Sequence, residues 1–247
     1  TKGTRELRYR NFFYYSTLGL VFVVVGTGLL FPLDWAAFVW AAMAVLMAWF
    51  SGRTGWVSLS LQCTFLLLAA GIGSGLLETG LGALAGEPTN DWAEFSYLHI
   101  GVAAATVACL FIPVAQQSER WGVLAGLPQL VVLALSVWEV GGLVVAYGSI
   151  LLAGADVTGI DRAALAALRT AVLSAASVTL ALSSRHWRWP EARWLVYPVL
   201  VLVGIKLFLE DFPHGQPATL FVALAFVGTA LLLVARLLRR EDKPSGV

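Results

Sequence analysis

Charged residues are scarce in this sequence. They make up 13% of the 247 residues, whereas hydrophobic residues make up 59% and the mean hydropathy is +0.80. A soluble domain carries about 25% charged residues. Half that charge, combined with several apolar runs of spanning length, indicates an integral membrane protein and excludes a large soluble core. The connections are short, so we expect one membrane domain over residues 1–247.

Cysteine and histidine are also rare, with two and three residues. Cys63 and Cys109 lie inside apolar runs, without CxxC spacing and without companion histidines. We interpret both as small packing residues, with a disulfide or a metal site as the alternative. His99 and His214 are expected near the outer surface and His186 on the cytoplasmic side, so no two histidines face each other across a haem. We expect no cofactor and no metal.

Motifs of known enzymes are missing as well. There is no Walker sequence, no GxGxxG between a strand and a helix and no HExxH, and nothing favours nucleic-acid binding. The enzyme alternative is a membrane serine protease with Ser74 as nucleophile and His99 as base. The Gly-x-Ser-Gly sequence that rhomboid proteases show requires glycine at position 72, where this chain has Ile72. We therefore expect a protein that is not an enzyme.

Apolar runs of spanning length are what the sequence has in abundance. Crossing roughly 30 Å of hydrocarbon takes about 20 residues at ~1.5 Å per residue. Prolines punctuate these runs, as at Pro32, Pro213 and Pro217. The pattern predicts an all-α integral membrane protein with eight transmembrane helices arranged as four hairpins, at approximately 12–31, 35–50, 56–77, 96–114, 121–142 with an apolar extension to 154, 163–183, 194–212 and 218–238.

Most of the 16 basic residues fall on one side of this arrangement. Basic residues are enriched in cytoplasmic segments, so both termini are predicted to be cytoplasmic in a bacterial inner membrane. The outer segments are acidic instead. The basic residues on the inner side are Lys2, Arg5, Arg8, Arg10, Arg53, Arg120, Arg185, Arg188, Arg193, Arg236, Arg239, Arg240 and Lys243.

The fifth run is longer than one crossing needs. From Trp121 to Gly154 it would measure about 50 Å as a single helix. Either the helix is tilted and projects outward, or it bends after one crossing and its end lies in the interface. The adjacent glycines Gly141 and Gly142 favour the bend.

Ionisable residues inside the spans are the first candidates for function, because each costs at least ~2.5 kcal/mol in the bilayer. Glu139, Arg169, Lys206 and His99 are all expected in the outer half of the membrane. Lys206 and Glu210 are four residues apart and can pair on one helix face. One interpretation is an outward-facing polar pocket that responds to ions or protons. The other is a set of structural ion pairs, with Arg169 and Lys206 reaching the outer headgroups.

The glycine-rich segment GIGSG places Gly71 and Gly75 at the spacing of a GxxxG motif. In a membrane this spacing lets two helices approach closely, so we interpret both glycines as packing residues.

The last hairpin, WLVYPVLVLVGIKLFLEDFPHGQPATLFVALAFVGTALLLVARLLRR, ends its first helix with Lys206, Glu210 and Asp211 and its second in arginines. In this it resembles the carboxy-terminal end of uncharacterised multi-span bacterial inner-membrane proteins. The resemblance implies no particular activity. It suits the membrane portion of a longer or processed chain, as does a first residue, Thr1, that is not methionine.

Two functions are therefore expected from the sequence. The first is a non-enzymatic integral subunit or scaffold of a larger bacterial inner-membrane assembly, with the lipid bilayer and other membrane subunits as partners. The alternative is a small-solute or ion transporter or channel that uses the outward-facing pocket.

Overall fold

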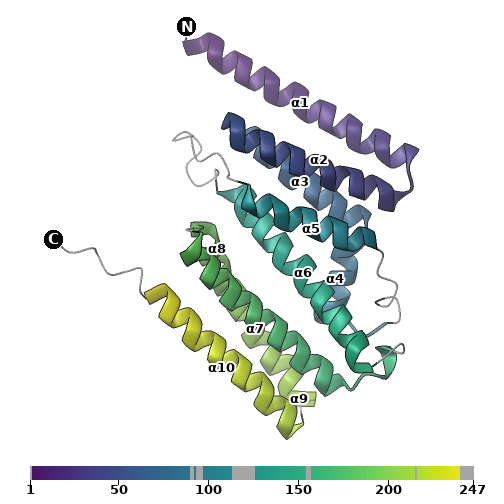
Figure 1. The fold of residues 1–247 in the computed structure, drawn as a ribbon, viewed down its shortest axis with the longest axis vertical. Helices are drawn as coiled ribbons and strands as arrows, with labels where there is room; N and C mark the ends of the chain where they lie inside the picture. The colour runs from purple at the N-terminus through teal and green to yellow at the C-terminus, as the bar shows by residue number, and fades with distance from the viewer. Residues whose placement is uncertain are drawn as a thin grey trace, which may run out of the picture. The chain divides into compact units, whose positions relative to one another are not determined.

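The computed structural model describes residues 2–89, 92, 97–112, 126–153, 157–187, 189–214 and 216–239, with the backbone alone at 2–13, 157 and 214. All regular elements in these ranges are helical (Figure 1), so the expected all-α class is confirmed for the part described. The elements are α1 (Lys2–Leu30), α2 (Leu33–Thr54), α3 (Val57–Gly73), α4 (Leu76–Ala85), α5 (Tyr97–Phe111), α6 (Leu127–Ala153), η3 (Val157–Gly159), α7 (Arg162–His186), α8 (Pro190–Lys206), η4 (Leu207–Asp211), α9 (Phe212–His214) and α10 (Pro217–Arg239).

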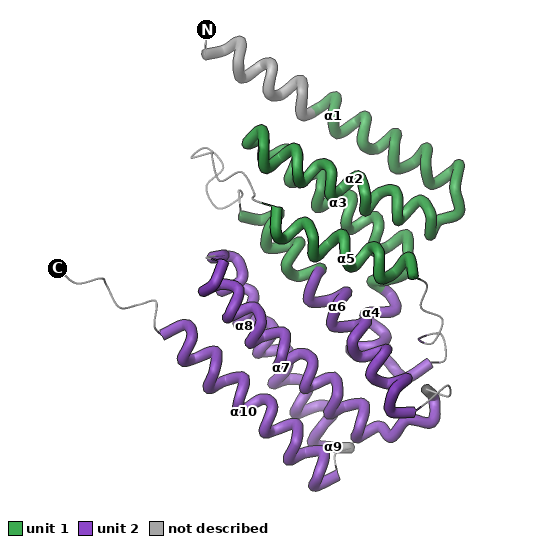
Figure 2. The backbone as a smooth tube through the Cα atoms, viewed as in Figure 1, with its two compact units in different colours: residues 1–77, 96–135 green, residues 78–95, 136–247 purple. Residues whose placement is uncertain are grey.

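The chain forms two compact units (Figure 2). Unit 1 contains residues 1–77 and 96–135, and unit 2 contains residues 78–95 and 136–247.

In unit 1, α2 packs against both α3 and α5. Hydrogen bonds tie α1 to its neighbours. Trp40 Nε1 of α2 donates to Thr27 Oγ1 at 2.6 Å, and Gln62 Nε2 of α3 donates to Ser16 Oγ at 2.8 Å and to Thr17 Oγ1 at 3.5 Å. The Trp40 ring also covers Gly73, where an added Cβ would lie only 2.8 Å from the indole. These polar side chains of apolar helices therefore pair with one another and hold α1 against α2 and α3.

In unit 2, α7 packs against both α8 and α10. The start of α7 is capped by Asp161, whose Oδ1 accepts from the Ala163 N–H at 3.2 Å. A cluster of buried apolar residues also joins α7 to α4 and α6. Its members are Ala83, Trp92, Val145, Ala146, Ile160 and Leu165. Unit 2 thus brings together elements that are far apart in the sequence.

Five helices in the described part are long and apolar enough to cross a membrane: α2, α6, α7, α8 together with η4, and α10. The bent pair α3 and α4 would be a sixth, and two apolar segments, Tyr14–Leu30 and Tyr97–Phe111, are shorter. The structure thus agrees with a multi-pass helical chain that has five or six candidate spans, and the number eight stays a prediction. Each of the eight predicted spans overlaps a helix. The predicted boundaries at 96, 114, 121 and 154 lie outside the described residues.

The third predicted span differs from the structure in one respect. A single helix over 56–77 followed by a loop was expected, but α3 ends at Gly73 and α4 begins at Leu76 after a bend of 71°. Gly75 makes the turn with φ +73°, a left-handed conformation that glycine adopts without steric cost. The chain then stays helical to Ala85, where the sequence analysis placed a loop.

The bend predicted at Gly141 and Gly142 is wrong, because α6 runs as one helix of 27 residues through both. At ~1.5 Å per residue it is about 40 Å long. The glycine at 142 is explained by packing instead, since a Cβ there would lie 2.5 Å from the Cα of Gly80 in α4. A side chain at Gly142 or at Gly80 would keep α6 and α4 apart.

Candidate functional site: a buried charge network

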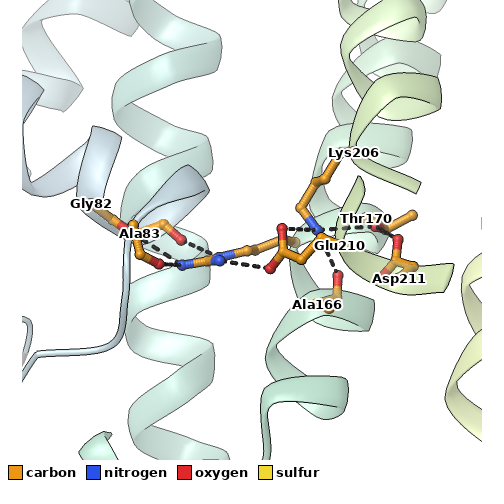
Figure 3. Close-up of polar contacts among 9 residues, drawn as sticks. Gly82, Ala83, Ala166, Thr170, Lys206, Glu210 and Asp211 are labelled. Carbon is orange, nitrogen blue, oxygen red and sulfur yellow. Dashed lines mark hydrogen bonds and ion pairs between the residues drawn. The ribbon is translucent and has the colours of Figure 1, made fainter. Parts of the chain in front are cut away.

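Arg169 on α7 is the centre of a charge network in unit 2 (Figure 3). The residue is 3% exposed, and its guanidinium reaches Gly82 and Ala83 at the carboxyl end of α4, both labelled in Figure 3. Nε donates to the carbonyl oxygen of Ala83 at 2.6 Å, and Nη2 donates to those of Gly82, at 3.3 Å, and Gly86. The Trp92 ring lies to one side, with its centroid 5.9 Å from Cζ.

These carbonyls explain why an arginine is stable here. The last four carbonyls of an α-helix lack partners within the helix, and the helix dipole makes this end partially negative. The planar guanidinium has five N–H donors in a fixed fork, so one side chain can serve several carbonyls at once. Arg169 therefore caps α4 and joins it to α7.

Glu210 balances the charge of Arg169 and of a second cation. Its Oε1 accepts from Arg169 Nη1 at 2.8 Å, and its Oε2 accepts from Lys206 Nζ at 2.9 Å. The predicted pairing of Lys206 with Glu210 is therefore present. Lys206 Nζ also donates to the carbonyl oxygen of Ala166 at 3.1 Å and to Thr170 Oγ1 at 3.4 Å. All three of its protons have acceptors on α7 or η4.

Asp211 extends the network to its fourth charged residue. It is 3% exposed, and its Oδ2 accepts from Thr170 Oγ1 at 2.6 Å. Thr170 thereby links Lys206 to Asp211. The formal charges of the two cations and the two carboxylates sum to zero, which lowers the cost of placing them in an apolar bundle.

The backbone that carries these carboxylates has an unusual local geometry. Leu207–Asp211 forms one turn of π-helix, closed by the Phe212 N–H bonding to the carbonyl oxygen of Leu207. Such turns insert an extra residue into an α-helix and are frequent at functional sites. Here the turn places Glu210 and Asp211 so that both meet partners on α7.

A pocket of about 320 Å³ opens beside the network, a size typical of small-molecule sites. The walls carry two arginines and two glutamates. Arg162 and Glu87 are 73% and 89% exposed and lie 3.9 Å apart, whereas Arg169 is buried and Glu210 is 30% exposed. The lining residues are Ala85, Gly86, Glu87, Pro88, Arg162, Leu165, Arg169 and Glu210.

The structure brings together three of the five predicted pocket residues, Arg169, Lys206 and Glu210. Arg169 and Lys206 turn into the protein, with side chains 4% and 10% exposed, so neither reaches outward to headgroups. Glu139 is fully buried on α6 in the same unit but does not line the pocket. His99 belongs to unit 1.

His99 is held by the turn after α3. Its Nε2 donates to the main-chain carbonyl oxygen of Ser74 at 2.7 Å, while the Ser74 hydroxyl donates to the carbonyl oxygen of Gly71 at 3.4 Å. The imidazole nitrogen thus contacts the backbone of Ser74 and not the hydroxyl that a serine protease would activate. Of the two predicted packing glycines, Gly71 is buried in α3, whereas Gly75 forms the turn and a Cβ there would meet nothing within 4 Å.

Sequence reasoning missed the acceptors at the end of α4 and the burial of Trp92, which is 2% exposed and lies beside Arg169. A sequence pattern does not show which main-chain carbonyls lie within reach of a side chain. One signal was present: an arginine two turns into an apolar helix needs a buried acceptor.

Among the described residues, no group of three or more His, Cys, Asp and Glu side chains is placed to hold a metal ion. The chain matches no protein-family model, no curated protein and no solved structure. The fold defines the class of the protein, a multi-helix chain with several apolar helices long enough to cross a membrane.

Proposed function

We propose that the chain crosses a bacterial inner membrane eight times, with both termini in the cytoplasm. Two observations support this topology: each predicted span overlaps a helix, and most basic residues of the sequence fall in the segments between spans that the alternation assigns to one side. α3 and α4 then form a single broken span. The short helix α5, with 15 residues, crosses where the bilayer is thinner or where the helix ends are polar.

We further propose that the protein is a non-enzymatic integral subunit or scaffold of a larger membrane assembly. The observation that carries this proposal is that the charges of the network pair with one another. Arg169 and Lys206 share Glu210, and the remaining donors bind main-chain or hydroxyl oxygens. Such an arrangement holds α4, α7 and α8 together rather than presenting reactive groups to a substrate.

The exposed apolar surface is consistent with this role. Only 17% of the most apolar stretch of α10 is buried, which leaves most of this helix free to contact lipid or neighbouring subunits. Large side chains on its open surface include Phe221 and Leu232, which are 72% and 75% exposed.

The pocket favours a second candidate function, a small-solute or ion transporter. Glu210 is 30% exposed and lines a cavity of about 320 Å³, so its carboxylate can meet a solute. A transporter would bind its solute here and exchange one of the existing ion pairs for the ligand.

Replacing Glu210 by Gln separates the two functions. The substitution leaves Arg169 and Lys206 without their shared carboxylate, so we expect a loss of stability of about 2 to 3 kcal/mol, at the lower end for broken buried pairs because Glu210 is partly exposed. A scaffold predicts that thermal stability and the yield of the native complex fall together, and that wild-type protein in liposomes carries no ion or solute flux. A transporter predicts flux in the wild type that Glu210→Gln abolishes.

Glu87→Gln is the matched control. Glu87 lines the same pocket but is 89% exposed and lies 3.9 Å from an equally open arginine. Exposed pairs contribute little to stability, so this variant should unfold and assemble like the wild type. Flux above that of empty liposomes in the wild type would refute the scaffold proposal.

A further inference from the structure

The two cysteines of the chain meet inside unit 1. Cys63 on α3 and Cys109 on α5 are 46 positions apart, yet the Cys63 thiol donates to the sulfur of Cys109 at an Sγ–Sγ distance of 3.9 Å. They are 3% and 5% exposed. The fold therefore creates a dithiol that the sequence spacing does not reveal.

A small cavity lies beside the two sulfur atoms. Its volume is about 20 Å³, enough for about one water molecule. Ser60, Thr64 and Gln129 line it together with both cysteines. The serine and threonine hydroxyls already have partners, since Ser60 bonds to Ser51 at 2.8 Å and Thr64 donates to the Ser60 carbonyl oxygen at 3.0 Å. The free space lets the cysteine side chains rotate toward each other.

We propose that Cys63 and Cys109 form a reversible disulfide that links α3 to α5, with a lipid-soluble quinone as oxidant. A disulfide bond is about 2 Å long, so the sulfurs need to approach each other by about 2 Å from their present separation of 3.9 Å. Water-soluble oxidants do not enter an apolar helix bundle readily, whereas a quinone partitions into the same hydrocarbon phase.

The reaction balances without any further reactant. Both S–H bonds break and one S–S bond forms between Cys63 and Cys109. Two electrons and two protons pass to the quinone, which becomes a hydroquinone. A dithiol reductant reverses the change by thiol–disulfide exchange.

The chain contains only two cysteines, which makes the test direct. The full chain in membranes or mild detergent is treated with duroquinone, whose ring is fully methylated and so does not add to thiols. The protein is then denatured, alkylated and weighed intact. We expect a species lighter by two hydrogens that takes up no alkyl group, one hydroquinone formed per chain, and a higher unfolding temperature that a reductant reverses.

The variants Cys63→Ser and Cys109→Ser serve as controls and should neither reduce the quinone nor shift in unfolding temperature after treatment. A wild-type chain that still takes up two alkyl groups after treatment overturns the proposal. So does a disulfide that joins two chains, because it would show that the thiols react outward and not with each other.

Discussion

At the residue scale, Arg169 shows why a buried cation can stabilise a membrane helix bundle. Its guanidinium binds three main-chain carbonyls and one carboxylate, drawn from the end of α4, from Gly86 just after it and from η4. Of these carbonyls, that of Gly82 also accepts from the Gly86 N–H at 2.8 Å. A buried polar group that is left unpaired costs about 1–3 kcal/mol. Arg169 is thus better explained as a residue that holds helices together than as a ligand-binding residue.

The first prediction concerns the geometry of this side chain. Arg169→Lys keeps the charge but replaces five donors in a planar fork by three on a single nitrogen, which cannot reach all the carbonyls and Glu210 together. We expect a loss of about 2 kcal/mol in the free energy of unfolding, measured by thermal or denaturant unfolding in detergent.

Arg162→Lys is the control for this prediction. Arg162 lies two turns earlier on α7 and is 73% exposed, so its replacement should leave the unfolding midpoint unchanged. Equal midpoints for both variants would show that the fork geometry of Arg169 does not matter.

At the scale of helices, glycine governs how closely neighbours approach. Gly142 of α6 faces the backbone of Gly80 in α4, and Gly148 faces Leu168 of α7, where a Cβ would lie 2.9 Å from the leucine Cδ2. Gly75 has a different task, because it turns the chain between α3 and α4 with φ +73°. Glycines that look equivalent in the sequence thus serve packing in one place and chain direction in another.

The second prediction uses the adjacent pair Gly141 and Gly142. Gly142→Ala places a methyl group 2.5 Å from the Gly80 Cα, which the backbone cannot relieve locally, so we expect a loss of stability of about 1–3 kcal/mol. Gly141→Ala meets only side-chain methyls of Val172 and Leu84, at 3.8 and 3.9 Å, and should be neutral or stabilising by up to about 1 kcal/mol. Thermal unfolding of both variants tests this. Similar losses for both would favour a flexible bend over a close helix contact.

At the scale of the whole molecule, much of the surface is apolar enough to face lipid. Large apolar side chains such as Leu151, Leu209 and Trp194 are 86%, 72% and 74% exposed. In water this would be an aggregation hazard, whereas in a bilayer it is the expected exterior. The charges of the network lie inside the protein, which is where a membrane protein places them.

The third prediction is the topology. A reporter that is active only in the cytoplasm should be active when it is fused at Trp187 or at Val247. A reporter that is active only after export should be active when it is fused at Glu87. The reason is the bias of arginine and lysine toward cytoplasmic segments. An exported reporter active at Val247 would contradict an even number of crossings with a cytoplasmic carboxyl end.

The helical segments and the Lys206–Glu210 pair were predictable, because apolar run length and i,i+4 spacing are properties of the chain itself. The break at Gly75 and the straight course of α6 were not. The sequence pattern assigned Gly75 to helix packing and Gly141–Gly142 to a bend, and the neighbours decide otherwise: Gly142 packs closely against Gly80, while an added Cβ at Gly75 would meet nothing within 4 Å.

The sequence by itself determined that this protein is built from apolar helices, because a chain with 13% charged residues and many spanning runs has no other way to satisfy its backbone in lipid. Only the tertiary structure decided which distant groups meet. It joined Arg169 to the carbonyls of α4 and Cys63 to Cys109, contacts that depend on helix packing and that no spacing along the chain encodes.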